Sequence, residues 1–174
     1  MALKINPQLL RFLIIAILFY IGWTALYELW IHPDRTLELW IVESISNIGS
    51  GALKLMGYEL ITTEFMIEHY RTMGIDGTHG VYISDSCAGL TLMALFTGFV
   101  MAYPGKWKIK LIFIPIGLLT IHLINILRII GLILLTKHAP NLLDFNHHYT
   151  FTFVVYAYIF ILWVIWVNKF GKSA

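Results

Sequence analysis

The chain has 174 residues, of which 59% are hydrophobic and only 13% are charged. Soluble domains average about 45–50% apolar and about 25% charged residues, whereas the mean hydropathy here is +0.77. A soluble fold of this size would expose far too much apolar surface, so the composition excludes a soluble domain and indicates an integral membrane protein. The net charge of +2 says little as a total. The length predicts a single membrane domain, residues 1–174.

Four apolar stretches approach the roughly 20 residues that a helix needs to cross a bilayer. They cover about residues 9–31, 87–103, 109–135 and 149–167. The first stretch is too long for the core of a cleaved signal peptide, which is about 7–15 residues, and no small-residue cleavage site follows it. The sequence therefore predicts an all-α bundle of about four transmembrane helices.

Basic residues in the short flanks of these stretches predict the orientation of the chain. Lys4 and Arg11 belong to the flank before the first stretch. Lys106, Lys108 and Lys110 lie between the second and the third, and Lys169 and Lys172 follow the fourth. With four spans, these three flanks share one side of the membrane, and we expect it to be the cytoplasmic side. Both termini are then inside, and residues 32–86 and 136–148 are extracytoplasmic.

Residues 32–86 are the only sizeable segment between the spans. Within residues 36–58 apolar side chains recur at helical spacing: Leu37, Ile41, Ile45 and Ile48. This pattern predicts an amphipathic helix at the membrane interface, with a re-entrant or spanning helix as the alternative. Further on, the dipeptide Asp76-Gly77 favours a tight turn and a short hairpin.

The only cysteine, Cys87, lies in the sequence ISDSCAGL at the outer end of the second stretch. That compartment is oxidising in bacteria, but the chain offers no second cysteine for a disulfide. An inert cysteine is expected among apolar residues inside a span, whereas this one follows Ser86 at the first turn of a predicted helix. Ser86 can cap that helix, and the helix N-terminus stabilises a thiolate. Asp85 opposes this effect unless it is turned aside or paired, while Ala88 and Gly89 leave room for a substrate backbone.

Arg128 lies inside the third stretch, roughly 10 Å from its outer end at 1.5 Å per residue. A charge at that depth is costly and is by default a functional-site hypothesis, although a guanidinium can also snorkel to the headgroups. His122 and Asn125 precede Arg128 at spacings of three. We expect this polar stripe to face other helices or a wet cavity. Asn125 could fix the arginine side chain or cap a neighbouring backbone group.

Asp144, His147 and His148 lie at the outer start of the fourth stretch. Histidines in a surface loop are ordinarily solvated, and His79 and His138 also lie outside. No His-x-x-x-His or Glu-x-x-His spacing typical of metal ligands occurs, so we predict no metal site. Asp144 precedes the pair by three and four residues and could orient one imidazole.

The predicted topology brings one cysteine, one arginine and a histidine pair from three different spans to the outer membrane face. A thiol with an imidazole partner is the requirement for acyl transfer through a thioester. A cationic donor such as Arg128 can then hold the oxyanion.

These motifs resemble those of the exosortase/archaeosortase family, which are multi-span membrane transpeptidases. The family has Cys-Ser/Ala-Gly at the start of one span, Asn-x-x-Arg within the next and a histidine at the last. The resemblance covers about residues 80–170, and the chain is similar to the compact forms, such as the exosortase F branch. It implies catalytic roles for Cys87, Arg128 and His147, with His148 as the alternate base. We favour His147 because Phe151 then follows one turn later.

The resemblance also implies the substrates and the location. They are exported proteins with a C-terminal signal of the PEP-CTERM kind, made of a short motif, a hydrophobic helix and a basic tail. The enzyme is expected in the bacterial inner membrane, in contact with membrane lipid, with its active site outside. The expected substrate contacts are Ser86, Ala88, Gly89 and Asn125. We expect no cofactor, metal or nucleic acid; the acceptor, an unknown nucleophile or water, stays open.

Three other functions remain open at this point. A thiol-dependent acyltransferase acting on membrane lipid would use the same face and the same thiol. A protease would cleave the signal without transfer. In a non-enzymatic subunit of a membrane complex, the arginine and the histidines would only hold helices together.

Overall fold

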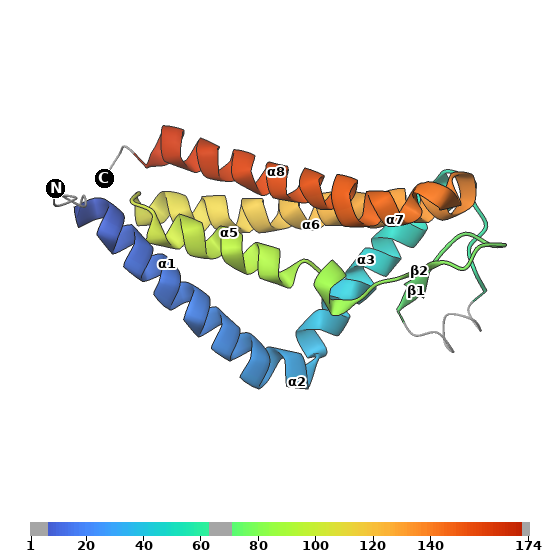
Figure 1. Cartoon of the computed structure of the whole chain (residues 1–174), viewed down its shortest axis with the longest axis horizontal. Helices are drawn as coiled ribbons and strands as arrows, with labels where there is room; N and C mark the ends of the chain where they lie inside the picture. The colour runs from blue at the N-terminus through green and yellow to red at the C-terminus, as the bar shows by residue number, and fades with distance from the viewer. Residues whose placement is uncertain (1–6, 63–70, 172–174) are drawn as a thin grey trace.

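The computed structural model describes residues 7–62 and 71–171, and almost all of them form helices (Figure 1). Helices α1 (Pro7–Leu26), α5 (Leu90–Ala102), α6 (Trp107–His138) and α8 (Phe151–Ile165) form the bundle. Helix α5 contacts the other three, and α6 also contacts α8. The predicted all-α membrane fold is therefore confirmed.

Three described segments are long and apolar enough to cross a membrane: Leu10–Asp34, Trp107–His138 and Pro140–Phe170. The second predicted span is shorter than expected, because α5 begins only at Leu90 and has 13 residues. A helix of that length rises about 20 Å, whereas the hydrocarbon core of a bilayer is about 30 Å thick.

The start of α1, the connection from α5 to α6 and the end of α8 lie at one end of the bundle (Figure 1). The prediction that the three basic flanks share one side of the membrane requires these three segments to lie at the same end of the bundle. At the other end, α6 continues into a 3-10 turn (Pro140–Leu142), α7 (Leu143–Phe145) and a π-helical turn (Asn146–Thr150) that leads into α8.

Helix α3 (Thr36–Leu55) packs against α6. A π-helical turn (Tyr27–Ile31) and α2 (His32–Asp34) form the corner between α1 and α3 (Figure 1). The bend is at Arg35, whose φ of 57° is left-handed.

The predicted helix within residues 36–58 is confirmed as α3, but its apolar side faces protein as well as solvent or lipid. Ile41 and Ile45 are buried in the core, whereas Leu37 and Ile48 are exposed. Helix α3 is not among the described segments that are long and apolar enough to span a membrane.

The predicted hairpin is also confirmed, although it is small. Strands β1 (Thr72–Met73) and β2 (Val81–Tyr82) pair antiparallel, with Thr72 opposite Tyr82. Gly77 lies in the connecting turn with a φ of 78°, a conformation that glycine adopts without strain. Strand β2 then leads directly toward Cys87.

The C-terminal end of α5 is capped by a buried lysine. The Lys110 Nζ donates hydrogen bonds of 2.8 Å to the carbonyls of Met101 and Tyr103, and only 5% of the residue is exposed. A cation at a helix C-terminus satisfies carbonyls that have no partner within the helix. Lys110 therefore fixes α5 against α6 as well as contributing to the basic flank.

We expect Lys110→Met to lower the free energy of unfolding by about 2 kcal/mol, because two charge-assisted hydrogen bonds in a buried site are lost while the aliphatic stem is kept. Lys108, which is exposed on the same flank, provides the matched control Lys108→Met. Thermal unfolding of both variants in the same detergent measures the difference. Equal stability of the two variants would contradict the capping role.

Candidate active site

Cys87 lies in a tight turn between β2 and α5. Residues Asp85–Cys87 form a 3-10 turn, in which the Cys87 N–H donates to the Ser84 carbonyl at 2.9 Å. Helix α5 starts only after Gly89, whose φ of 81° interrupts the helical path. The prediction that Cys87 occupies the first turn of this helix, with Ser86 as its cap, is therefore wrong. The Ser86 side chain lies outside the described part of the chain.

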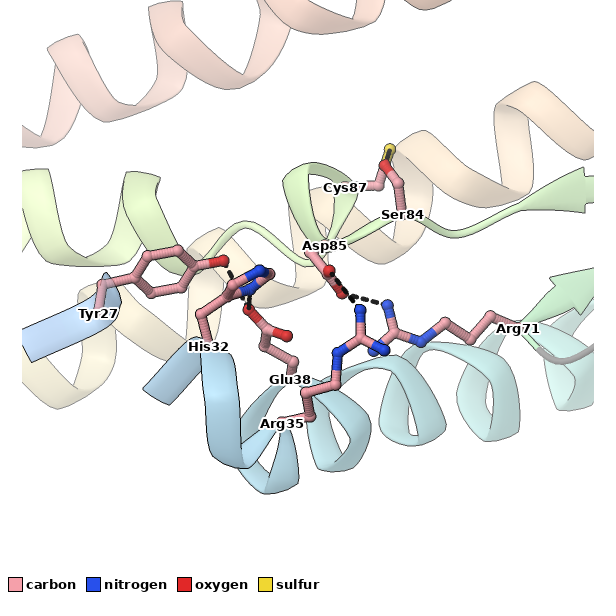
Figure 2. Close-up of polar contacts among 8 residues, drawn as sticks. All are labelled: Tyr27, His32, Arg35, Glu38, Arg71, Ser84, Asp85 and Cys87. Atoms are coloured by element: carbon pink, nitrogen blue, oxygen red, sulfur yellow. Dashed lines mark hydrogen bonds and ion pairs between the residues drawn. The ribbon is translucent and has the colours of Figure 1, made fainter. Parts of the chain in front are cut away.

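The thiol is placed between a hydroxyl and an imidazole. The Ser84 Oγ donates to the Cys87 Sγ at 3.2 Å (Figure 2), and the His147 Nε2 lies 3.9 Å from the same sulfur. Cys87 is only 4% exposed and the neighbouring Ala88 is fully buried. The thiol thus has a proton acceptor within reach and little contact with bulk solvent.

Asn125 holds the cysteine turn on α6. Its Nδ2 donates to the Cys87 carbonyl at 2.6 Å, and the residue is buried. Glycine is favoured at position 89 because its φ of 81° is left-handed, a conformation that strains other residues. Earlier in α6, the His122 Nε2 is 3.0 Å from the Ser44 Oγ of α3. These contacts confirm that the polar stripe of α6 faces protein, and Asn125 binds a backbone group, one of its two predicted roles.

Arg128 follows one helical turn after Asn125 and is partly buried. Its positive charge acts on the His147 imidazole. Within residues 7–62 and 71–171, no hydrogen bond or ion pair engages this guanidinium, and its Nε is buried without a partner. The side chain therefore remains available to an anionic group.

The two adjacent histidines occupy different surroundings. His147 is partly buried with its Nε2 toward Cys87, whereas His148 is exposed with its Nδ1 3.1 Å from the Asp144 Oδ1. Asp144 thus orients His148 rather than the histidine that faces the thiol.

The ring of Phe151 packs closely against Gly131 of α6, since a Cβ on Gly131 would lie only 2.7 Å from the ring. This contact places the start of α8 close to α6.

Asp85, two residues before the cysteine, is paired with two arginines (Figure 2). Arg71 Nη1 donates to one carboxylate oxygen, and Arg35 Nη2 lies 3.6 Å from the other. The Arg71 hydrogen bond lowers the pKa of Asp85, although burial acts in the opposite direction. This Arg71–Asp85–Arg35 cluster answers the question that the sequence left open, since the carboxylate is neutralised beside the thiol. Sequence reasoning did not single out either arginine.

A second buried carboxylate lies next to this cluster. Glu38 is fully buried, and its Oε1 accepts a hydrogen bond of 2.5 Å from the Tyr27 hydroxyl and lies 3.3 Å from the His32 Nδ1. Ligand atoms of His32, Glu38 and Asp85 lie within 4.8 Å of one another. However, the two guanidiniums that bind Asp85 would repel a cation, so we do not assign a metal site here.

A cavity of about 340 Å³ opens beside His147. It is lined by Gly80 and the residues of β2 and by residues of α6 and α7, including Leu132 and Leu143. The imidazole therefore contacts the thiol on one side and an accessible space on the other.

The sequence of the chain matches the model of the transmembrane exosortase family (Exosortase_EpsH) over residues 5–166. The chain belongs to this family. No curated protein and no solved structure matches it significantly. Membership makes this exosortase a multi-pass membrane protein with a general transpeptidase-like role, in a family that acts on exported proteins with C-terminal signals. The match is to the family as a whole and does not single out a branch.

In this exosortase, Asp85→Asn and Arg71→Gln should shift the pH dependence of Cys87 alkylation in opposite directions. Loss of the carboxylate leaves two cations near the thiol, so the thiolate forms at lower pH. Loss of Arg71 leaves the carboxylate less compensated, so the thiolate forms at higher pH. Iodoacetamide labelling measured by mass spectrometry between pH 6 and 9 reads this out, because Cys87 is the only cysteine.

The lowered pKa of Asp85 keeps its carboxylate ionised throughout that range, since an ordinary aspartate titrates near about 3.9. The other charged or titratable side chains near the thiol, His147 and Arg128, are unchanged in both variants. A shift of the two variants in the same direction would show that the cluster affects only the packing of the turn.

Proposed function

We propose that this exosortase is a cysteine transpeptidase that cleaves C-terminal sorting signals at the outer face of the bacterial inner membrane. The supporting observation is that the Cys87 Sγ lies 3.9 Å from the His147 Nε2. The charge of Arg128 acts on the same imidazole from an adjacent helix. These observations support a nucleophile and a base within reach of each other, with a cation whose charge reaches the base.

The chemistry begins with transfer of the Cys87 proton to the His147 Nε2. The thiolate then attacks the carbonyl carbon of the scissile peptide bond and forms a tetrahedral intermediate. Its collapse breaks the C–N bond, and His147 gives the proton to the departing amine. The substrate remains attached to Cys87 as a thioester. An acceptor nucleophile or water attacks this thioester, transfers its proton to His147 and releases the thiol.

Arg128 stabilises the oxyanion of the tetrahedral intermediate. Among the described residues, no carboxylate forms an ion pair with its guanidinium. In a site shielded from water, a fixed cation has a large effect on a charge that develops during the reaction. Asn125, which binds the Cys87 carbonyl, positions the nucleophile rather than contacting the reacting atoms.

The membrane itself brings the substrate to this site. A sorting signal with an apolar helix lies in the same bilayer as the enzyme, and this confinement raises the effective concentration of its motif. The protein therefore does not need a large recognition surface.

We expect Cys87→Ala to abolish processing and Arg128→Lys to lower its rate by about 10²–10³, because lysine keeps the charge but loses the planar fork of donors. His147→Ala should be slow, with partial rescue as pH rises and the thiolate forms unaided. His148→Ala is the matched control and should have a mild effect. The assay follows removal of the C-terminal signal from an exported protein of the same genome that ends in a motif, an apolar helix and a basic tail.

The variants must be compared at equal abundance in the membrane. Normal processing by Cys87→Ala would exclude the enzyme, and near-normal turnover by Arg128→Lys would exclude the oxyanion role. An inactive His148→Ala beside an active His147→Ala would move the base to His148. A fatty-acyl adduct on Cys87 in place of a peptide would identify a lipid acyltransferase.

The side of the membrane can be tested with introduced cysteines at exposed positions, since a bulky impermeant maleimide would react poorly with Cys87, which is only 4% exposed. In the Cys87→Ala background, His79→Cys in the hairpin should react with an impermeant maleimide in intact spheroplasts. Lys108→Cys, between α5 and α6, should react only after the membrane is breached. Both positions are exposed. The reverse pattern would place the active site in the cytoplasm.

A further inference from the structure

The second strand of the hairpin lines the cavity beside His147. The Ile83 N–H donates to the Arg71 carbonyl at 2.9 Å, and Thr72 pairs with Tyr82 in the next position. Hydrogen-bonded and non-hydrogen-bonded pairs alternate along an antiparallel ladder. Thr72 and Tyr82 are therefore a non-hydrogen-bonded pair, so the N–H and C=O of Tyr82 point away from β1.

Within residues 7–62 and 71–171, the backbone of Tyr82 has no hydrogen-bond partner. Gly80, Val81 and Tyr82 line the cavity of about 340 Å³ together with Leu132, Leu143 and His147. An unpaired strand edge is a template for pairing with another extended chain. Here that template faces a space large enough for a few residues, with an apolar wall opposite.

The same edge leads to the nucleophile. Strand β2 ends at Tyr82, and the chain reaches Cys87 five residues later through the turn that Asp85 and its two arginines hold. His147 belongs both to the cavity wall and to the surroundings of the thiol. A peptide lying along β2 is therefore directed to the sulfur and the imidazole.

We propose that the outer edge of β2 binds the motif of the substrate as an added β-strand, with the backbone of Tyr82 as its hydrogen-bonding partner. This inference rests on the proposed function, because it assigns a peptide to the Cys87–His147 site. The ligand is an extended polypeptide backbone whose inward side chain meets Leu132 and Leu143. In such strand addition, backbone hydrogen bonds provide affinity and the pocket selects alternate side chains.

The experiment uses acetyl-trialanyl chloromethyl ketone, whose methylene carbon is attacked by the Cys87 thiolate with loss of chloride to give a thioether. Iodoacetamide reacts with the same thiol but has no peptide to bind. The measured quantity is the ratio of the two alkylation rates in membranes, which corrects each variant for the reactivity of its thiol. We expect this ratio to be three- to tenfold lower in Tyr82→Pro than in Tyr82→Ala, because proline removes the outward N–H.

A matched probe tests the same contact without changing the protein. A trialanyl reagent with one N-methylated peptide bond cannot donate a hydrogen bond from that nitrogen. We expect one member of a series, methylated at each bond in turn, to show a three- to tenfold lower ratio of alkylation rates on the wild-type protein. Equal ratios for all probes on the wild type, or for Tyr82→Pro and Tyr82→Ala, would overturn the strand-addition model. Neither result bears on the enzyme itself, since the processing test with Cys87→Ala decides that separately.

Discussion

The hydrogen bond from the Asn125 amide to the Cys87 carbonyl is the contact on which the candidate site depends. It is buried between two helices, where leaving either group without a partner would cost about 1–3 kcal/mol. The chain makes this turn through Gly89, whose left-handed φ of 81° separates the cysteine turn from α5. These two residues set the start of α5, the depth of the thiol and its approach to His147. A polar bond inside an apolar bundle therefore determines the geometry of the site.

Charge compensation separates Asp85 from the candidate catalytic group Arg128. Asp85 is neutralised by two arginines. Arg128, by contrast, has no carboxylate partner in the part of the chain that the structure describes. A partly buried cation without compensation is costly in a membrane protein. An anionic intermediate at Cys87 would provide the missing partner, which is the physical argument for an oxyanion role.

Local patterns were sufficient to predict most of the fold, whereas the details of the site depend on distant contacts. Apolar length predicted the long spans, helical spacing predicted α3, and the Asp76-Gly77 dipeptide predicted the hairpin. The 3-10 turn was missed because Ser86 suggested a cap, although Gly89 was a signal that the helix starts later. Arg35 and Arg71 belong to other elements, and no spacing relates them to Asp85. His147 and His148 differ by about 100° around a helix, so only packing decides which one faces the thiol.

The lengths of the helices relate the depth of the thiol to the position of a substrate. Asn125 lies 18 residues after the start of α6 at Trp107, or about 27 Å along its axis at 1.5 Å per residue. That distance is close to the roughly 30 Å thickness of the hydrocarbon core, so Cys87 lies near its outer boundary if α6 starts at the inner one. The rest of α6 continues past this level, and the hairpin lies beside that part of the helix (Figure 1). A substrate whose own helix ends at this boundary continues past the thiol as an extended chain, whose backbone groups need new hydrogen-bond partners. Strand β2, which lies past the thiol and leads back to it, is in a position to provide such partners.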